Sequence, residues 1–380
     1  MTSGGHDDGA SLDRALRRLY LDALAEGDGP DGGGYGGGGY GGLLGDLTSE
    51  AGLDDRGHGG EADARGPGRA VDGRLSGAGL GVPAPGGLGE PGSGGASNGG
   101  GPRSRLLGAA RARRRPAAVV SGYGAPYAAR VAALDALLAG AREDDWSTVI
   151  VEGWTLHELV AHLMATDSLV AAAVGAPVAG PPLTANDTLG RTAEMQAYQR
   201  EREPERTRAE WREQADAICR TIAAIEPDRA VDPGGMRLPI SDHMLARTLE
   251  TWIHTDDAAR RIGLNLPLPV AEHINPMADL CARLVPWTML LSGMTPPEGA
   301  SVRVTMTGPG GGTWHVPLDV ARPAFRDGTT PADAEITCDV VDLCFLFGGR
   351  RDPARFDAEI GGDAGLARQV ITAAPALSGP

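Results

Sequence analysis

A glycine-rich stretch near the start of the chain limits which parts of it can fold. Residues 27–101 contain 31 of the 58 glycines, including the run GGGYGGGGYGG, and aromatic residues make up only 4% of the chain. Such a segment cannot bury enough apolar surface to offset the conformational entropy that it would lose on ordering. We therefore predict a disordered linker over residues 27–115 and a folded core in the part that follows.

One feature precedes this linker, and another forms its last part. Residues 11–26 have a stripe of leucines at helical spacing and predict a short amphipathic helix within residues 1–26. It could dock on its own protein or bind a protein partner. At the other end, the segment PRSRLLGAARARRRP holds six arginines, which favours a solvated flank, with an acidic partner, nucleic acid or lipid as the alternative.

Composition excludes several classes of function. A net charge of −15 argues against general nucleic-acid binding. The four cysteines are scattered without a C-x-x-C pair, so neither a zinc knuckle nor a disulfide framework is indicated. No apolar run resembles a signal peptide or is long enough to cross a bilayer, so we expect a cytoplasmic protein without membrane association.

The most informative stretch is residues 241–263, SDHMLARTLETWIHTDDAARRIG. Ser241 is a candidate N-cap, and Gly263 stands where a helix would end in a left-handed residue. The apolar residues between them recur at helical spacing. Glu250 and His254 are four residues apart, so they project side by side from such a helix.

An E-x-x-x-H pair needs a third ligand to form a metal site. Residues 153–175, GWTLHELVAHLMATDSLVAAAVG, predict a second helix with His162 on its apolar face. Thr155 and Glu158 form a capping box, which explains Glu158 without a metal. Two imidazoles and one carboxylate leave open positions, as in catalytic sites for zinc or another divalent metal.

Periodicity divides the rest of the folded part into elements. Helices are predicted at residues 126–140, 188–225 with a break near Pro204, 271–291, 341–347 and 366–374, and strands at 301–307, 313–318, 334–339 and 355–360. We therefore predict a helical bundle over residues 120–265, a connecting helix over 270–295 and an α+β domain over 300–375.

The motifs GWTLHELVAHL and LETWIHTDDAARRIG together resemble the mycothiol-dependent maleylpyruvate isomerase family. The resemblance implies a mainly α protein, with a DinB-like four-helix bundle that binds zinc through His162, Glu250 and His254. The segments LCFLFGGRR and IGGDAGLARQVI resemble the small, sterol-carrier-like C-terminal domain of that family.

The resemblance also implies a reaction. A bound thiol, mycothiol, would add to a cis double bond, allow rotation and leave, while the metal activates the thiol. Arg350 matches a family arginine that could bind a substrate carboxylate, although it could simply cap a helix end. We expect Arg350→Ala to keep the metal and lower turnover. Asp257 could orient His254, or pair with Arg260 or Arg261.

Three functions remain open from the sequence. The chain could be an isomerase, or a mycothiol S-transferase that attaches the thiol to an electrophilic small molecule. It could instead be a regulatory adaptor without catalysis, with the bundle as a metal sensor and residues 11–26 as the partner-binding helix.

Overall fold

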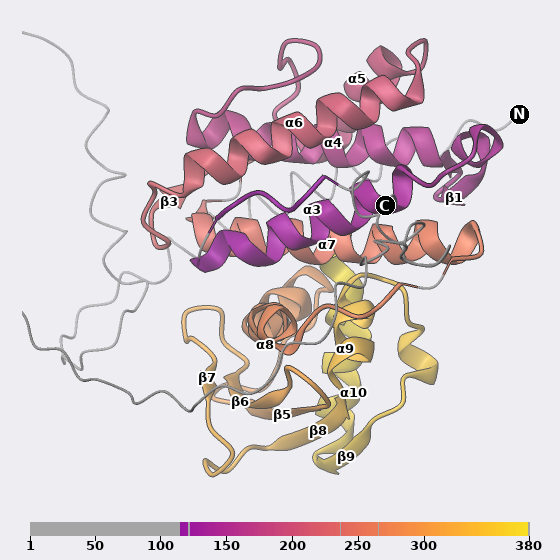
Figure 1. The fold of residues 1–380 in the computed structure, drawn as a ribbon. Helices are drawn as coiled ribbons and strands as arrows, with labels where there is room; N and C mark the ends of the chain where they lie inside the picture. Colours follow the sequence, from indigo (N-terminus) through magenta and orange to yellow (C-terminus); the bar gives the residue numbers. More distant parts are fainter. Residues whose placement is uncertain (1–114, 121, 236, 265, 379–380) are drawn as a thin grey trace, which may run out of the picture. The chain divides into compact units, whose positions relative to one another are not determined.

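The computed structural model describes residues 115–120, 122–235, 237–264 and 266–378 (Figure 1). The predicted helix at 11–26 and the glycine-rich linker lie outside the described residues, as does all of the arginine-rich segment before Arg115. Within the described ranges, no helix is both long enough and apolar enough to cross a membrane.

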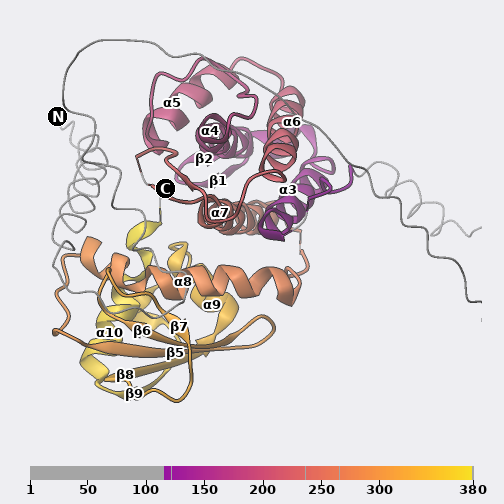
Figure 2. The same ribbon diagram turned by 90° about the vertical axis from the view of Figure 1, so that its left-hand side faces the viewer.

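Five helices build the first part of the structure, with the bounds α3 Ala125–Leu138, α4 Leu156–Val174, α5 Thr188–Gln199, α6 Pro204–Ile222 and α7 Ile240–Arg261. Helix α4 packs against α5 and α6, and α3 packs against α6 and α7 (Figures 1 and 2). The predicted third helix is thus two helices, because Pro204 has no N–H to continue α5 and instead begins α6. The result is a four-helix bundle whose third member is split.

Short elements join these helices. They are the 3-10 turns η2 Gly122–Gly124 and η3 Glu143–Ser147, the hairpin of β1 Val149–Val151 with β2 Trp154–Thr155, and the hairpin of β3 Ala230–Val231 with β4 Leu238–Pro239. The β1–β2 hairpin leads directly into α4, and the β3–β4 hairpin leads directly into α7. The two hairpins therefore fix the positions at which α4 and α7 begin.

The predicted helix ends are correct in part. The Thr155 hydroxyl accepts the N–H of Glu158 at 3.2 Å, and the Glu158 carboxylate accepts the N–H of Thr155 at 3.0 Å, so the capping box is confirmed. Gly263 has φ +74°, as predicted for the residue after a helix. Ser241 is not the N-cap of α7, because the helix already begins at Ile240 after Pro239, without a side-chain cap.

The second part of the structure is a five-stranded sheet with helices. The strands are β5 Ser301–Thr307, β6 Gly312–Pro317, β7 Phe325–Arg326, β8 Ala334–Asp339 and β9 Glu359–Gly362, in the spatial order β7-β6-β5-β8-β9. Strands β5 and β8 are parallel, and the other neighbours are antiparallel. Helices α8 Ala271–Leu291, α9 Val340–Phe347 and α10 Ala364–Ala373 accompany this sheet (Figure 2). The protein is therefore mainly α, with a smaller α+β part.

One strand prediction needs correction, and one strand of the sheet was not predicted. The strand predicted from residue 355 begins only at Glu359, because Pro353 starts the 3-10 turn η4 Pro353–Arg355 instead. The edge strand β7 has only two residues, both exposed, so it shows no alternation that a sequence pattern could reveal. A last 3-10 turn, η5 Ala374–Leu377, follows α10.

The described residues form two hydrophobic cores that meet at α7. Met244 and Ala258 of α7 belong to the core of the bundle, whereas Leu249, Trp252 and Ile253 belong to the core of the α+β part. Helix α8, predicted as a connection, buries its apolar face in the second core. Helix α7 is therefore held from two sides, which fixes the residues that it carries. The domain boundaries themselves stay predictions.

Candidate metal centre

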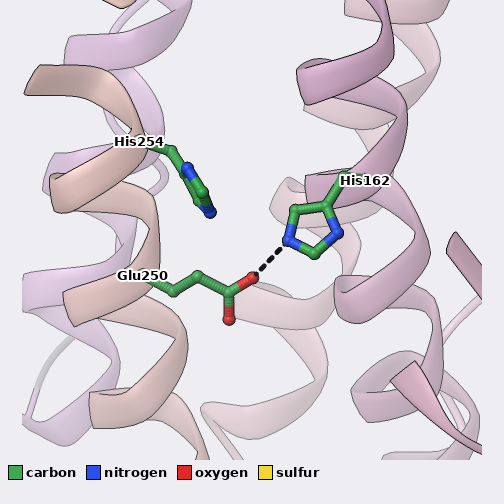
Figure 3. A group of neighbouring side chains, drawn as sticks. All are labelled: His162, Glu250 and His254. Carbon is green, nitrogen blue, oxygen red and sulfur yellow. Dashed lines mark hydrogen bonds and ion pairs between the residues drawn. The ribbon is translucent and has the colours of Figure 1, made fainter. Parts of the chain in front are cut away.

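Three potential ligand side chains converge between α4 and α7. One donor atom each of His162, Glu250 and His254 lies within 4.8 Å of the others (Figure 3). His162 comes from the middle of α4, and the other two lie one turn apart on α7. The side chains of His162 and His254 are only 3% and 4% exposed, whereas that of Glu250 is 31% exposed. Solvent therefore reaches the group at the carboxylate.

His162 is held on both sides of its ring. Its Nε2 lies 2.9 Å from Oε1 of Glu250, and its Nδ1 lies 2.9 Å from the hydroxyl of Thr192 on α5. The ring of Trp154, from the hairpin before α4, stacks at a centroid distance of 4.8 Å. Burial lowers the pKa of His162, outweighing the nearby carboxylate. The neutral imidazole that metals bind is therefore the favoured form.

Glu250 is ionised by a chain of buried partners. Its Oε2 pairs with Arg247, which lies one turn earlier on α7. Nε of Arg247 donates to Asp167 at 2.9 Å, and the Trp211 indole donates to the other Asp167 oxygen at 3.1 Å. Burial opposes ionisation of Glu250, but Arg247 and His162 outweigh it and hold the pKa of this carboxyl well below its usual range. The carboxylate is thus ready to accept a cation.

His254 completes the group and has the fewest partners. Its ring lies 5.3 Å from that of His162, at an angle of 80°. Its buried Nδ1 lies 3.4 Å from the Asp257 carboxylate, in an ion pair that does not meet hydrogen-bond geometry. Asp257 therefore faces one ring nitrogen of His254, and the other nitrogen, Nε2, is the one that could bind an ion.

The chemistry of the donor set fits a divalent cation. Two imidazoles and one carboxylate are ligands that zinc and other first-row metals accept, and three protein ligands leave room for a further one. The residues predicted from the sequence as ligands are thus brought together in space. Their role as metal ligands remains a proposal.

Arg350 lies on the other side of Asp257. It follows α9, and its Nε and Nη2 donate to the Asp257 carboxylate at 3.0 and 2.9 Å, while Nη1 donates to the Gly348 carbonyl at 2.9 Å. Burial opposes ionisation of Asp257, but His254 and Arg350 outweigh it and lower its pKa. The alternative pairing of Asp257 is not formed, because Arg260 pairs with Asp256 and Arg261 donates to the Val149 carbonyl. Arg350 therefore connects the α+β part to His254 through Asp257.

Sequence reasoning predicted Asp257 beside His254 but missed the residues behind the other two donors. Arg247 could have been found three residues before Glu250 on the same helix face, and Asp167 is a charge within an apolar helix, which calls for a partner. Thr192 gives no such signal, because nothing in the sequence indicates that α5 brings its hydroxyl to His162.

None of the four cysteines is placed to act as a nucleophile. All four are buried. Burial raises the pKa of Cys219 and of Cys338 to about 12, so these thiols carry no thiolate at neutral pH. A thiolate at this centre would have to come from a small molecule.

The fold and the group of donors define a class: a helical-bundle protein with a candidate metal centre made of two histidines and one glutamate. Residues 127–259 match the family model described as mycothiol maleylpyruvate isomerase N-terminal domain. This range runs from the third residue of α3 to two residues before the end of α7 and contains all three donors. This part of the chain is therefore similar to that family. The match covers about a third of the chain.

The chain is also similar to individual proteins. Two uncharacterized proteins, from two strains of Mycobacterium tuberculosis, are 26% identical over 258 residues, which is 65% of this chain and 91% of theirs. Crystal structures of the mycothiol-dependent maleylpyruvate isomerase and of one of its mutants are 15% and 14% identical, with TM-scores of 0.39, covering 60% of this chain and 88% of theirs.

Proposed function

We propose that His162, Glu250 and His254 bind one divalent cation, preferably zinc, and that the chain uses it with mycothiol in isomerase-like chemistry. The observation that carries the proposal is the convergence of two imidazoles and one carboxylate within 4.8 Å, from helices of a bundle that matches the model of this family's N-terminal domain. When bound, the cation would lower the pKa of a thiol and polarise a carbonyl group.

The chain's own residues prepare the donors. Arg247 keeps Glu250 anionic, so that the carboxylate supplies the charge that a dication needs. The hydroxyl of Thr192 can accept a hydrogen bond from an N–H at Nδ1 of His162, which leaves the lone pair on Nε2 free to bind. The hydrogen bond between His162 and Glu250 would then give way to two bonds to the ion.

The proposed reaction is an isomerisation that consumes no thiol. The thiolate forms a carbon–sulfur bond to one carbon of a cis double bond, the remaining single bond rotates, and the same carbon–sulfur bond breaks to give the trans product. In a transferase the first bond would persist, so the same centre could also attach the thiol to an electrophile. The buried cysteines leave this role to an external thiol.

Arg350 is the proposed contact for a substrate carboxylate, and the structure adds a second role for it. Since its guanidinium holds Asp257, and Asp257 lies beside His254, Arg350 could act by positioning that histidine. Arg350→Lys separates these roles. Lysine would keep a charge for the substrate but lose the two-pronged contact with Asp257.

The test of the proposal is metal content per chain, measured by elemental analysis after purification without chelators. We expect about one zinc per chain in the wild type, because a site with three protein ligands holds one ion. His162→Ala, Glu250→Ala and His254→Ala should each lose it while remaining folded. His157→Ala, on the same helix α4 but outside the group, is the matched control. A wild type that binds no zinc when zinc is offered would contradict the proposal.

A further inference from the structure

A second feature of the centre concerns how Glu250 would bind the ion. The two oxygens of this carboxylate have different partners: Oε1 faces His162 at 2.9 Å, and Oε2 is paired with Arg247. A carboxylate can bind a metal through one oxygen or through both. Because Arg247 is paired with Oε2, it affects whether this oxygen can also bind the metal.

Arg247 is fixed firmly enough to keep its place beside Oε2. Its side chain is 8% exposed, and it donates through Nε to Asp167, which is 1% exposed, at 2.9 Å. Asp167 is itself held by Trp211 from α6. The guanidinium is therefore held beside Oε2 by Asp167 of α4, whose carboxylate is in turn held by Trp211 of α6.

The side chains of Arg247, Asp167 and Glu250 together carry one net negative charge. Arg247 and Asp167 cancel one another, so Glu250 contributes one net negative charge to the group. A dication bound there by two neutral imidazoles would retain one net positive charge, which favours an anionic further ligand such as a thiolate.

We propose that Arg247, anchored by Asp167, is a positioning residue that keeps Oε2 of Glu250 from the cation and thereby preserves an open coordination position. This inference rests on the proposed function. Glu250 binds through Oε1 alone, and the position that Oε2 would have taken is left for the thiol. The guanidinium does not touch the substrate.

The experiment replaces the ion by Co²⁺, whose visible absorption is intense in four-coordinate sites and weaker at higher coordination. The main variant is Asp167→Asn with Arg247→Met, which removes both charges together and so avoids an isolated buried charge. It frees Oε2 without changing the net charge of the network. We expect it to bind one Co²⁺ per chain, as the wild type does, with its visible band reduced to about half or less, as four-coordination expands to five.

A second measurement follows the open position itself. Titration of the Co²⁺ protein with 2-mercaptoethanol, followed through the sulfur-to-cobalt charge-transfer band, should show binding to the double variant about 10-fold to 100-fold weaker, the usual effect of losing a partner of a ligand. Arg247→Lys keeps the positive charge but lacks the several N–H donors of a guanidinium, so it should show an intermediate change. It replaces the double variant if that variant does not fold.

Arg212→Lys is the matched control. Arg212 is another buried arginine of the same bundle, 2% exposed and paired with Asp216 and Asp135, but it has no contact with the three donors. Its Co²⁺ spectrum and thiol affinity should equal those of the wild type. If the wild type binds Co²⁺ and the Arg247 variants share its spectrum and thiol affinity, this inference alone is overturned. If the wild type binds no Co²⁺, the proposed function falls with it.

Discussion

At the scale of single residues, the candidate centre is a set of three donors, each with a polar neighbour from outside the set. Thr192 lies at His162, Arg247 at Glu250 and Asp257 at His254. Such neighbours set the direction of a ligand and the atom through which it binds. The affinity of the site for a metal should therefore depend on residues that never touch the ion.

Thr192→Val tests this dependence. Valine matches threonine in shape but cannot accept a hydrogen bond from the N–H at Nδ1 of His162. We therefore expect the zinc dissociation constant to rise about 10-fold to 100-fold. Competition with a chromophoric chelator would measure it. Thr248→Val is the control, because that buried hydroxyl only bonds the Met244 carbonyl within α7. Equal affinities for the wild type and Thr192→Val would show that Thr192 is unimportant.

The buried cysteine of α6 predicts a dependence of stability on pH. The pKa of Cys219 is raised from 9.0 to about 12 by burial, so the folded protein keeps the thiol protonated where the unfolded chain has lost the proton. Its contribution to stability is therefore complete below pH 9 and decreases as the pH rises towards 12.

Urea unfolding of the wild type and Cys219→Ala at pH 8, 9 and 10 would measure this effect. The wild type should lose more of its free energy of unfolding than the variant between pH 8 and pH 10. Any constant offset between the two reports the lost packing of the side chain and not the titration. Parallel pH profiles for both proteins would contradict the raised pKa.

At the scale of elements, α7 combines two tasks on one helix. It carries Glu250 and His254, and it also supplies apolar residues to both cores. Ile253, next to His254 in the chain, packs against the end of α9 at Gly348. The position of the helix that carries two of the candidate donors is thus set by packing with the α+β part.

Gly348→Ala should disturb this contact. The added Cβ would collide with Cδ1 of Ile253, which is only 4% exposed and has little room to move. We expect a loss of about 1–3 kcal/mol, the usual cost of overpacking a core, seen as a lower melting temperature. Gly348 has φ −83°, so backbone strain does not contribute.

Gly328→Ala is the matched control for this substitution. A Cβ there would meet Thr313 at 3.7 Å, an ordinary contact, so the melting temperature should stay near that of the wild type. If Gly348→Ala melts at the same temperature as Gly328→Ala, the contact between α9 and α7 is less tightly packed than the structure indicates.

The sequence predicted the elements better than the contacts between them. Glycines, prolines and the capping box mark the ends of α4, α6 and α7 because these signals act within a few residues. The pairing of Arg247 with Asp167 joins residues 80 positions apart. Local patterns carry no information on such a pairing, and the two-residue strand β7 is too short to have a pattern at all.

At the scale of the whole molecule, all three donors lie well after the glycine-rich part of the sequence. We predict that a chain without residues 1–114 binds the same amount of zinc as the full chain. It would begin at Arg115, whose guanidinium pairs with Asp216 of α6 at 2.6 Å, so this contact is retained. Elemental analysis of both proteins would measure the zinc.

The same truncation separates enzyme from adaptor. An isomerase or transferase should retain its turnover with mycothiol, whereas an adaptor that acts through residues 11–26 should lose its partner. A truncated protein that folds but binds no zinc would show that the first 114 residues contribute to the centre. Turnover and zinc should be measured on the same preparation.

The position of His162 and Glu250 on two helices has one more consequence. These residues are 88 positions apart in the chain, and α4 and α7 meet at them side by side. An ion bound between them would lock the axial register of the two helices, because sliding by one helical turn, about 5.4 Å, would separate the donors. Metal binding would then report whether α4 and α7 are correctly aligned, because a chain with misaligned helices would fail to retain the ion.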